Sequence, residues 1–530
     1  MPVIINRSGL RFKAEPARII SRFHYSAGVE RNYSIISRVL NLSDSDIQEN
    51  LNNILRNFSK RHRNISKIFE KNFDQIFSIF SNLNPQVISE ITVEKIVNLQ
   101  SLLQIINTDI EFKSRSKKLL IGAYYTMEYS IESAAFFNPS IVEHPDQSGL
   151  EQEKEKRIIL SFRATGEGHI SSLVFREGYI DQGNKIILES VSKLLDVPEV
   201  VNRHIYIKVD FFKKLHEMNI YQFNGNKQTE NNINLIKQTI QMIMNKLEDK
   251  FTYDRLHFLI EEAMKDPELT DSEKTAVKTI SWLADSHYEI EFSLDTAVSE
   301  RVIFPISYTE RNGIEDARFV KFTDEDGSII YFATYTAYDG FTILPRLIQT
   351  KDFYNFKIRP LNGKYARNKG MALFPRKING KYVMLSRYDG TNNYVMYSDN
   401  LNLWQNADKL ENPIHPWEII QSGNCGSPIE TKEGWLMLTH GVGAMRRYCI
   451  GAVLLDLDNP AKIIGYLKEP LLGPNEDERE GYVPNVVYSC GSMIHNDVLV
   501  LPYGISDTAS TYATINIEEL LNALIRSPVV

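Results

Sequence analysis

The chain has 530 residues, a length that predicts two domains, one of them large. Hydrophobic residues make up 43% and charged residues 24%, which are globular values and exclude a mainly disordered chain. The formal net charge of −7 disfavours nucleic acid as a partner, because a protein that binds the phosphate backbone needs a basic face.

Cysteine usage and the lack of long apolar runs predict a cytoplasmic protein without a membrane partner. Cys425, Cys449 and Cys490 are widely spaced and form neither a disulfide framework nor a Cys-x-x-Cys metal signature. Charged residues interrupt the N-terminal segment before a signal-peptide core is complete. No run approaches the roughly eighteen apolar residues of a membrane span. We therefore expect a reducing compartment and no bound metal.

The N-terminal region is predicted to be helical. Between residues 30 and about 137, apolar residues recur at helical spacing, as in Ile47, Leu51, Ile54, Leu55 and Phe58. Ser43 is placed to cap a helix, with Asp46 three residues later. Pro139 is expected to end a later helix over 118–137. An amphipathic membrane or partner surface is the weaker alternative, because the polar faces mix charges with Asn and Ser.

A short β segment and a second helical block follow. Between Phe162 and Ile180, glycines and β-forming residues predict strands joined by a turn. From about Asn231 to Trp282, apolar residues again recur at helical spacing, at Ile233, Ile236, Ile240, Ile243 and Leu247. The sheet is therefore expected to be interrupted by a helical insertion.

After Tyr288 one pattern returns four times: a turn pair, a strand of aromatic and β-branched residues, and a polar or glycine-rich end. The copies begin at Asp326, Asn379, Glu433 and Asn496. Strand-rich repeats of roughly 50 residues are typical of propeller blades. A β-sandwich is the competing fold, but it would not be expected to place polar residues after every inner strand. In a propeller, such strand ends converge on one central funnel.

The polar ends of the repeats would bring a mainly basic set of side chains to this funnel. The set comprises Asp316, Arg318, Arg367 to Lys369, Arg387, His440, Arg446, Arg447 and Asp507. Cations gathered at strand ends suit an anion, and a lone carboxyl among them can protonate a leaving group. Phosphate plus a proton donor is therefore one hypothesis. The alternative is that each residue is a solvated charge on the rim.

Signatures of several other enzyme classes are absent from the sequence. It contains no Walker loop, no HExxH, no GxSxG elbow and no glycine fingerprint that opens a helix. The turn Thr165–His169 holds two glycines and would suit an unspecific anion nest. His169 fits a turn residue as well as a site residue.

The stretch Asn312–Arg318, NGIEDAR, resembles glycoside hydrolase family 130, the mannoside phosphorylases and β-mannosidases. Further stretches agree in the same order: TYTAYDG, ALFPRKINGKYVMLSR, GWLMLTHGV, YCIGAVLLDLDNPAKII, GYVPNVVYSCG and PYGISDT. The similarity covers residues 285–530 and Phe162 to Ile180. So many ordered matches are more specific than one short motif.

This resemblance implies a mainly β fold, a five-bladed β-propeller, in which Asp316 is the general acid. It also implies that inorganic phosphate attacks the anomeric carbon with inversion and releases α-mannose 1-phosphate, while the proton of the acid passes through a hydroxyl of the bound sugar. The implied phosphate-binding residues are Arg367, Asn368, Lys369, Arg387 and His440. The implied sugar-binding residues are Glu315, Arg318, His169, Arg163, Tyr448, Tyr488 and Asp507. Tyr448 and Tyr488 would alternatively only pack within strands.

Two features depart from the compact members of the family. Where short phosphorylases often carry a lysine, this chain has Glu430, within Gly426–Thr431. A carboxylate there would repel phosphate and would suit the base of an inverting hydrolase, which needs two carboxyls roughly 6.5–9.5 Å apart. The second departure is the helical N-terminal extension together with the helical insertion, which resembles a longer subgroup.

We expect a helical N-terminal domain at 1–155, first propeller strands at 156–182, a mostly helical insertion at 183–284 and a five-bladed propeller at 285–530. The favoured function is inverting phosphorolysis of β-mannosides, with phosphate as co-substrate and no other cofactor. The alternatives are a β-mannoside hydrolase, a mannosyltransferase using a sugar phosphate donor, and a non-catalytic sugar-binding propeller. The expected ligands are a β-linked mannooligosaccharide or mannosyl disaccharide and phosphate, and a homo-oligomer is one option.

Overall fold

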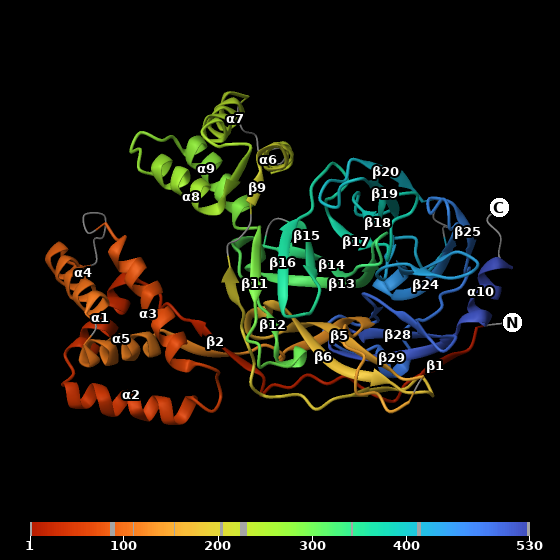
Figure 1. Cartoon of the computed structure of the whole chain (residues 1–530), viewed down its shortest axis with the longest axis horizontal. Coiled ribbons are helices and arrows are strands. Elements are labelled where there is room, and N and C mark those ends of the chain that lie inside the picture. Colours follow the sequence, from red (N-terminus) through yellow and green to blue (C-terminus); the bar gives the residue numbers. More distant parts are fainter. Residues whose placement is uncertain are drawn as a thin grey trace. The chain divides into compact units, whose positions relative to one another are not determined.

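The computed structural model describes residues 3–84, 91–109, 111–152, 154–201, 205–222, 230–340, 343–410 and 415–526. The chain divides into two compact units (Figure 1). The smaller unit consists of residues 15–131 and 192–196. The larger unit contains residues 1–14, 132–191 and 197–530.

The smaller unit is built from helices and one antiparallel pair of strands, which are far apart in the sequence. Its elements are β2 (Ile19–Phe23), α1 (Val29–Leu40), α2 (Asp44–Phe58), α3 (Ile65–Ser81), α4 (Val93–Thr108), α5 (Phe112–Tyr124) and β3 (Thr126–Ser130). The predicted cap of α2 is confirmed, since Ser43 Oγ accepts a hydrogen bond from the Asp46 backbone N–H at 3.2 Å. Ile47 and Leu51 are buried against the neighbouring helices, as the spacing predicted.

The helix expected over 118–137 is wrong beyond Tyr124. Residues 126–130 instead form β3, which pairs with β2, and residues 135–143 form strand β4 (Ala135–Glu143) of the larger unit. Pairing with distant strands outweighs the local helical spacing here, as tertiary context commonly does. At Asn138, whose φ is 52°, the backbone enters the left-handed region and the pairing of β4 shifts register before Ser140.

The larger unit is mainly β and repeats an antiparallel four-stranded arrangement. Two such groups lie in one eleven-stranded sheet, namely β4 with β5 (Lys156–Thr165), β6 (Ser171–Ile180) and β7 (Ile186–Leu188), and β13 (Gly313–Thr323) with β14 (Ile329–Tyr338), β15 (Ile343–Thr350) and β16 (Asn355–Pro360). They are joined by the parallel pair Gly313 and Ser171. The same sheet includes β8 (Glu199–Val201), β11 (Tyr288–Glu291) and β12 (Val302–Ile303).

Three further sheets contain the rest of these strands. One has β17 (Lys369–Leu373), β18 (Tyr382–Arg387), β19 (Tyr394–Ser398) and β20 (Asn406–Lys409). The next has β21 (Gln421–Asn424), β22 (Ile429–Glu430), β23 (Trp435–Val442), β24 (Tyr448–Leu455) and β25 (Ile463–Tyr466). The last has β26 (Val487–Tyr488), β27 (Met493–His495), β28 (Val498–Ile505), β29 (Ala509–Asn516) and the N-terminal β1 (Ile5–Arg7), and α10 (Ile517–Ile525) follows it.

The four sequence repeats occupy equivalent places in these sheets. Their strands become β14, β18, β23 and β28, each of which pairs on both sides within its group. Strand β5 has the same position between β4 and β6. No comparable turn pair precedes it in the sequence, so it does not share the pattern of the four predicted repeats.

Neighbouring sheets of the larger unit share apolar cores. Phe322 of β13 and Met384 of β18 belong to one buried cluster. Phe374 and Trp435, from the next two sheets, have ring centroids 5.1 Å apart. Between the last sheet and the first, Ser510 Oγ donates a hydrogen bond to the backbone carbonyl of Phe136 at 3.1 Å. Each sheet therefore packs on the next, and the last contacts the first.

The insertion contains four helices among its described residues and has its own core. Its elements are β9 (Ile205–Ile207), α6 (Lys208–Gln222), α7 (Glu230–Asn245), β10 (Lys250–Thr252), α8 (Tyr253–Met264) and α9 (Asp271–Ala284). Ile236, Ile240, Ile243 and Leu247 are buried in this core, which confirms the helical spacing. The side chain of Ile233 lies outside the described residues.

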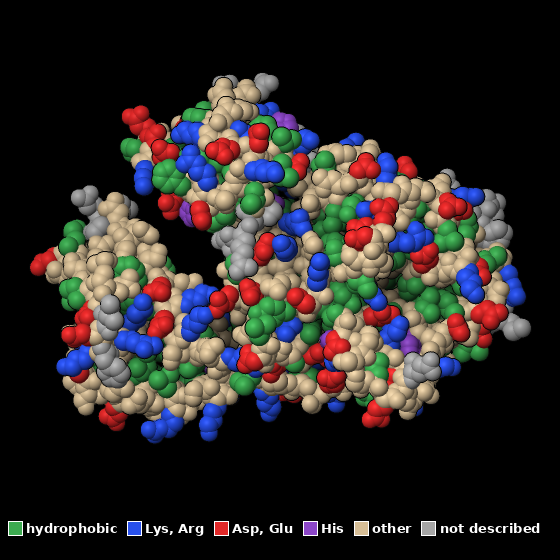
Figure 2. All heavy atoms as spheres, in the orientation of Figure 1, with side chains coloured by type: hydrophobic (Ala, Val, Ile, Leu, Met, Phe, Trp, Pro, Cys, Tyr) green, Lys and Arg blue, Asp and Glu red, His purple; other side chains and the backbone are tan. Residues whose placement is uncertain are grey.

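Surface charge is mixed on the face that Figure 2 shows, where acidic and basic side chains are interspersed. Within the described residues, every helix falls short of the length and apolar character that crossing a membrane requires. The three cysteines are buried and unbridged.

Candidate active site

Asp316 lies in strand β13 at the point where the pairing of β13 with β14 is interrupted. The register between β13 and β14 shifts between Glu315 and Arg318, and Asp316 has a left-handed φ of 54°. Asp316 Oδ1 accepts a hydrogen bond from Asn138 Nδ2 at 2.7 Å, and Arg163 Nη1 lies 3.5 Å away. A left-handed non-glycine residue costs backbone energy, and such residues are found disproportionately at functional sites.

Arg163 and Lys369 meet at the neighbouring carboxylate. Arg163 Nη2 is 2.9 Å from one oxygen of Glu315, and Lys369 Nζ is 2.6 Å from the other. Arg163 Nε also donates to Ser171 Oγ at 2.8 Å. Residues from β5, β6, β13 and β17 are therefore joined in one network around Asp316.

Arg318 links Asp316 to the last sheet. Its Nη1 donates to the backbone carbonyl of Asp316 at 3.1 Å, and its Nη2 donates to the Tyr488 hydroxyl at 2.7 Å. Arg318 is buried, and its Nε has no hydrogen-bond partner within the described part of the chain. A buried N–H of a charged group without a partner is costly unless a ligand satisfies it.

Arg387 and His440 form a second buried pair. Arg387 Nη1 donates to His440 Nε2 at 3.1 Å, and the opposite ring nitrogen, Nδ1, donates to the Asn424 carbonyl at 3.1 Å. Burial, followed by the charges of Arg387 and Arg318, lowers the pKa of His440 well below its ordinary value. His440 is thus neutral near pH 7, with its lone pair directed at the guanidinium.

Arg387 is a buried cation without a carboxylate counter-charge among the residues that the structure describes. Its Nε is buried without a hydrogen-bond partner, and within the described residues it forms no ion pair with a carboxylate. Burying an unpaired charge is expensive. Such a group fits a site whose counter-ion is a ligand.

Electrostatics push the pKa values of two carboxyls apart. Burial raises the pKa of Asp316, but Arg163, Arg318 and Lys369 outweigh that effect, so the net pKa lies below its ordinary value. Burial and the charge of Asp316 raise the pKa of Asp507 to about 6, although Arg163 and Arg446 act against them. Two nearby carboxyls with opposite shifts are a recurring property of sites that move protons.

The remaining predicted residues lie around this network or at its edge. The Arg367 guanidinium lies over the Tyr388 ring at 5.3 Å, and Asn368 Oδ1 accepts from the Lys369 backbone N–H at 2.9 Å. The rings of Tyr448 and Tyr488 have centroids 6.2 and 4.8 Å from that of His440.

Two predicted residues differ from the rest in their surroundings. His169 is exposed, and its ring stacks on Tyr482 at 5.1 Å. Glu430 binds Arg376 through both carboxylate oxygens, at 2.6 and 2.8 Å, on a strand end where its side chain is 42% exposed. None of the described contacts of Glu430 reaches the network around Asp316, so the structure does not bring this residue to the site.

Sequence reasoning missed Asn138, Ser171 and Asn424. Asn138 was placed at a helix end, whereas its amide holds Asp316 and its own Oδ1 is buried without a partner within the described part. The one available signal was the Asn-Pro pair, which favours turns and the left-handed conformation. Ser171 accepts from Arg163 on the adjacent strand, and Asn424 Nδ2 donates to the Gly370 carbonyl 54 positions away. Neither contact corresponds to a spacing pattern that the sequence would reveal.

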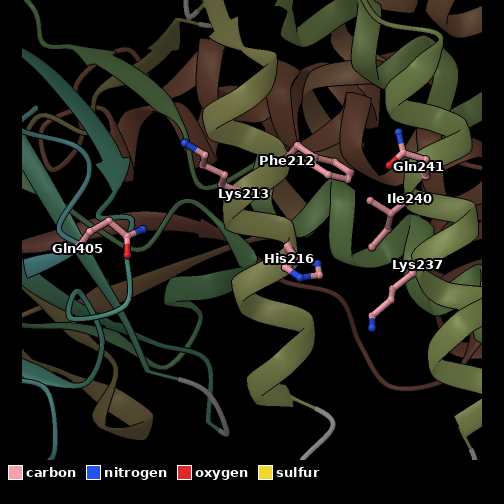
Figure 3. Close-up of a pocket in the computed structure, with 7 residues that line it drawn as sticks. All are labelled: Phe212, Lys213, His216, Lys237, Ile240, Gln241 and Gln405. Atoms are coloured by element: carbon pink, nitrogen blue, oxygen red, sulfur yellow. The ribbon is translucent and has the colours of Figure 1, made fainter.

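A separate cavity of about 500 Å³ lies between helices α6 and α7 of the insertion and Gln405, which precedes β20 (Figure 3). It is lined by Phe212, Lys213, His216, Lys237, Ile240, Gln241 and Gln405. Its polar side chains are all exposed, and Figure 3 shows Lys213 and Lys237 on different sides of α6. The cavity contains no residue of the network around Asp316. Within the described residues, no group of three acidic, His or Cys side chains is placed to hold a metal.

The larger unit is mainly β and gathers buried arginines around one carboxylate with a left-handed backbone, an arrangement suited to an anion beside a carboxyl group. The model of a family described as beta-1,4-mannooligosaccharide phosphorylase matches residues 271–526. A 1,2-beta-oligomannan phosphorylase of Thermoanaerobacter sp. is 38% identical over 219 residues, which cover 40% of this chain and 71% of that protein. The chain belongs to glycoside hydrolase family 130 and is a carbohydrate-active enzyme.

Other relatives carry related names. A beta-1,2-mannobiose phosphorylase of Listeria innocua is 34% identical over 253 residues, which cover 45% of this chain and 66% of that protein. The solved structure of a beta-1,2-mannobiose phosphorylase from Listeria innocua, in complex with beta-1,2-mannobiose, is 25% identical, covers 75% of this chain and 93% of that chain, and gives a TM-score of 0.43.

Proposed function

We propose that this enzyme cleaves β-mannosides with inorganic phosphate, releasing α-mannose 1-phosphate and a shortened saccharide. The observation that carries the proposal is Arg387, a buried cation without a described carboxylate partner, in the same network as Asp316. The names of the relatives agree, since three that are 34–38% identical are phosphorylases of β-1,2-linked mannosides.

Charge balance favours an anion as the ligand. The cations Arg163, Arg318, Lys369 and Arg387 face the carboxylates Glu315 and Asp316, and Asp507, whose pKa is raised to about 6, is a third carboxyl of the same network. Even with all three carboxyls ionised, positive charge remains for a ligand such as phosphate. Arginine and lysine donors at close range are the usual ligands of phosphate.

The proposed reaction uses these groups in three roles. Phosphate is held by Arg387 and Lys369, with Arg367 and Asn368 beside them, and His440 orients the Arg387 guanidinium. One phosphate oxygen attacks the anomeric carbon and forms the new C–O bond while the glycosidic C–O bond breaks. The proton of Asp316 reaches the leaving oxygen, through a sugar hydroxyl if the carboxyl does not touch it.

Binding of phosphate would also favour protonation of Asp316, the proposed general acid. In the free protein the surrounding cations keep the pKa of Asp316 low against the effect of burial, so the group is ionised near neutral pH. A dianion placed among the same cations cancels their field at Asp316 and raises its pKa. Asp316 then takes up the proton that it later donates. The general acid is therefore protonated when phosphate, the nucleophile, is bound.

We further propose that the larger unit is a five-bladed propeller. Its blades are β4–β7, β13–β16, β17–β20, β21–β25 and the sheet of β26–β29 with β1. Support comes from the shared cores of successive sheets and from the contact of the last sheet with the first, where Phe136 accepts from Ser510. The division into 1–155, 156–182, 183–284 and 285–530, the cytoplasmic location and the homo-oligomer stay predictions.

An assay with and without phosphate tests the function. Purified protein is incubated with β-1,2- and β-1,4-mannooligosaccharides, and we expect mannose 1-phosphate only when phosphate is present. Asp316→Asn should lower turnover by about a thousandfold or more, because it removes the proton donor at nearly constant volume.

The other outcomes of this assay each contradict the proposal. Free mannose in either buffer would indicate a hydrolase. Elongation from mannose 1-phosphate without measurable cleavage would indicate a mannosyltransferase. Full activity of Asp316→Asn would remove the acid from the mechanism, and binding without turnover in any buffer would indicate a sugar-binding propeller.

A further inference from the structure

Two exposed aromatic rings stand next to the network around Asp316. Tyr482 is 67% exposed, and its ring stacks on that of His169, with centroids 5.1 Å apart and planes inclined by 24°. His169 adopts a left-handed φ of 57°, a strained backbone conformation that is more frequent at functional sites. The exposed face of a stacked aromatic ring is a surface on which the apolar face of a sugar can pack.

Both rings come from turns that border the site. His169 precedes Ser171 by two residues, and Ser171 Oγ accepts a hydrogen bond from Arg163, the cation nearest to the Asp316 carboxylate. The Tyr482 backbone N–H donates to Thr508 Oγ1 at 3.0 Å, directly after Asp507. The aromatic pair therefore lies at the open edge of the network, between the Arg163 strand and the Asp507 turn.

We propose that Tyr482, stacked on His169, is the aromatic wall that contacts the leaving-group sugar of the substrate. This inference rests on the proposed function. The sugar that is transferred must place its anomeric carbon between Asp316 and the phosphate, among buried side chains. The rest of the saccharide then extends toward solvent, where the exposed pair is situated. Aromatic faces receive the apolar C–H faces of pyranose rings, while the hydroxyls of the sugar remain solvated.

The wall predicts a preference for longer saccharides. Stacking adds affinity for each sugar that reaches the pair and does not touch the reacting atoms. Loss of the wall should therefore raise KM for the saccharide and leave kcat and the KM for phosphate unchanged.

Binding to an inactive enzyme tests the wall separately from the reaction. In the Asp316→Asn protein, calorimetric titration with β-1,2-mannotriose should show a Kd raised about tenfold by Tyr482→Ala. Tyr482→Phe should bind within about twofold of the parent, since it keeps the ring. Tyr124→Ala, which removes an exposed tyrosine of the smaller unit, is the matched control and should change nothing.

The outcomes separate the two proposals. The proposed contact between Tyr482 and the sugar is wrong if Tyr482→Ala binds mannotriose as tightly as Tyr124→Ala does. It is also wrong if mannotriose does not bind at all. If Tyr482→Ala loses affinity for mannotriose while the unsubstituted enzyme forms no mannose 1-phosphate, the sugar contact at Tyr482 is supported and the proposed phosphorolysis is wrong. In the active enzyme, a drop in kcat of Tyr482→Ala without a rise in its KM for the saccharide would also contradict the proposed sugar contact.

Discussion

Asp316 and Asp507 differ in protonation because their neighbours differ. Asp316 is buried but faces Arg163, Arg318 and Lys369, whose charges keep the carboxylate ionised. Asp507 is buried beside Asp316 itself, and the repulsion between the two, added to burial, raises the pKa of Asp507 to about 6. One carboxylate thus stays charged to hold the arginines, and the other changes its charge just below neutral pH.

Asp507 should destabilise the fold at high pH. Its pKa rises on folding from an ordinary value of about 4 to about 6, so the folded protein binds the proton more tightly. The contribution of protonated Asp507 to the free energy of unfolding is fully present below pH 4 and is lost as the pH rises through 6. We expect Asp507→Asn to exceed the parent in free energy of unfolding by up to about 3 kcal/mol at pH 8 and to equal it at pH 4.

Thermal unfolding at both pH values measures this difference. Asp399→Asn, at a carboxylate whose side chain is 83% exposed, serves as the control and should shift stability by less than about 0.5 kcal/mol at either pH. Equal effects of Asp507→Asn on the free energy of unfolding at pH 4 and pH 8 would mean that folding does not raise the pKa of the Asp507 carboxyl.

At the scale of strands, close approach between elements positions the phosphate-binding side chains. Strand β21 passes β23 at Gly423, which pairs with His440. A Cβ at Gly423 would lie 2.3 Å from His440 Cε1 and 3.0 Å from Arg387 Nη1. Strand β21 can therefore run past the Arg387–His440 pair only because this residue has no side chain.

Gly423→Ala should displace that pair without unfolding the protein. We expect the KM for phosphate to rise by about tenfold or more, because Arg387 loses the position that His440 gives it. Steady-state kinetics with varied phosphate and an intact circular dichroism spectrum provide the measurement. Gly9→Ala is the control, since a Cβ there meets nothing within 4 Å. An unchanged KM for phosphate in Gly423→Ala would argue against Arg387 as a phosphate ligand.

At the scale of the whole molecule, the N-terminal segment joins the first and last sheets of the larger unit. Strand β1 pairs with β29, and the Phe12 backbone N–H donates to the Ser510 carbonyl at 2.8 Å. The Phe12 ring is fully buried, 5.5 Å from Phe162 of β5 and 6.2 Å from Tyr512 of β29. This ring therefore packs between the first and last sheets, where the proposed propeller would close.

Phe12→Ala should weaken that closure. Removing a buried phenyl ring costs about 3–5 kcal/mol, and here the cavity would open between two sheets. The midpoint of chemical unfolding, followed by tryptophan fluorescence, should fall accordingly. Phe258→Ala, which truncates a phenylalanine that is 57% exposed, should change the midpoint little. Similar midpoints for the two variants would contradict a closed arrangement of the sheets.

Local patterns in the sequence were sufficient for several features of this protein. The Ser43 cap, the helical spacing of the insertion and the four repeated strands depend on neighbouring residues, and the structure confirms them. Glycoside hydrolase family 130 was also recognisable, because its motifs are contiguous stretches. The same local evidence failed at 125–137, where partners far along the chain turn a helical pattern into strands.

Only the tertiary structure decided which charges meet. Asn138 reaches Asp316 across 178 positions of the chain, and Arg163 reaches it across 153, so no spacing rule links them. Glu430, which resemblance placed near the chemistry, is bound instead by Arg376. Hydrophobic spacing determines local elements because burial acts on each segment separately, whereas the electrostatics of a site depend on distances that exist only after the sheets have packed.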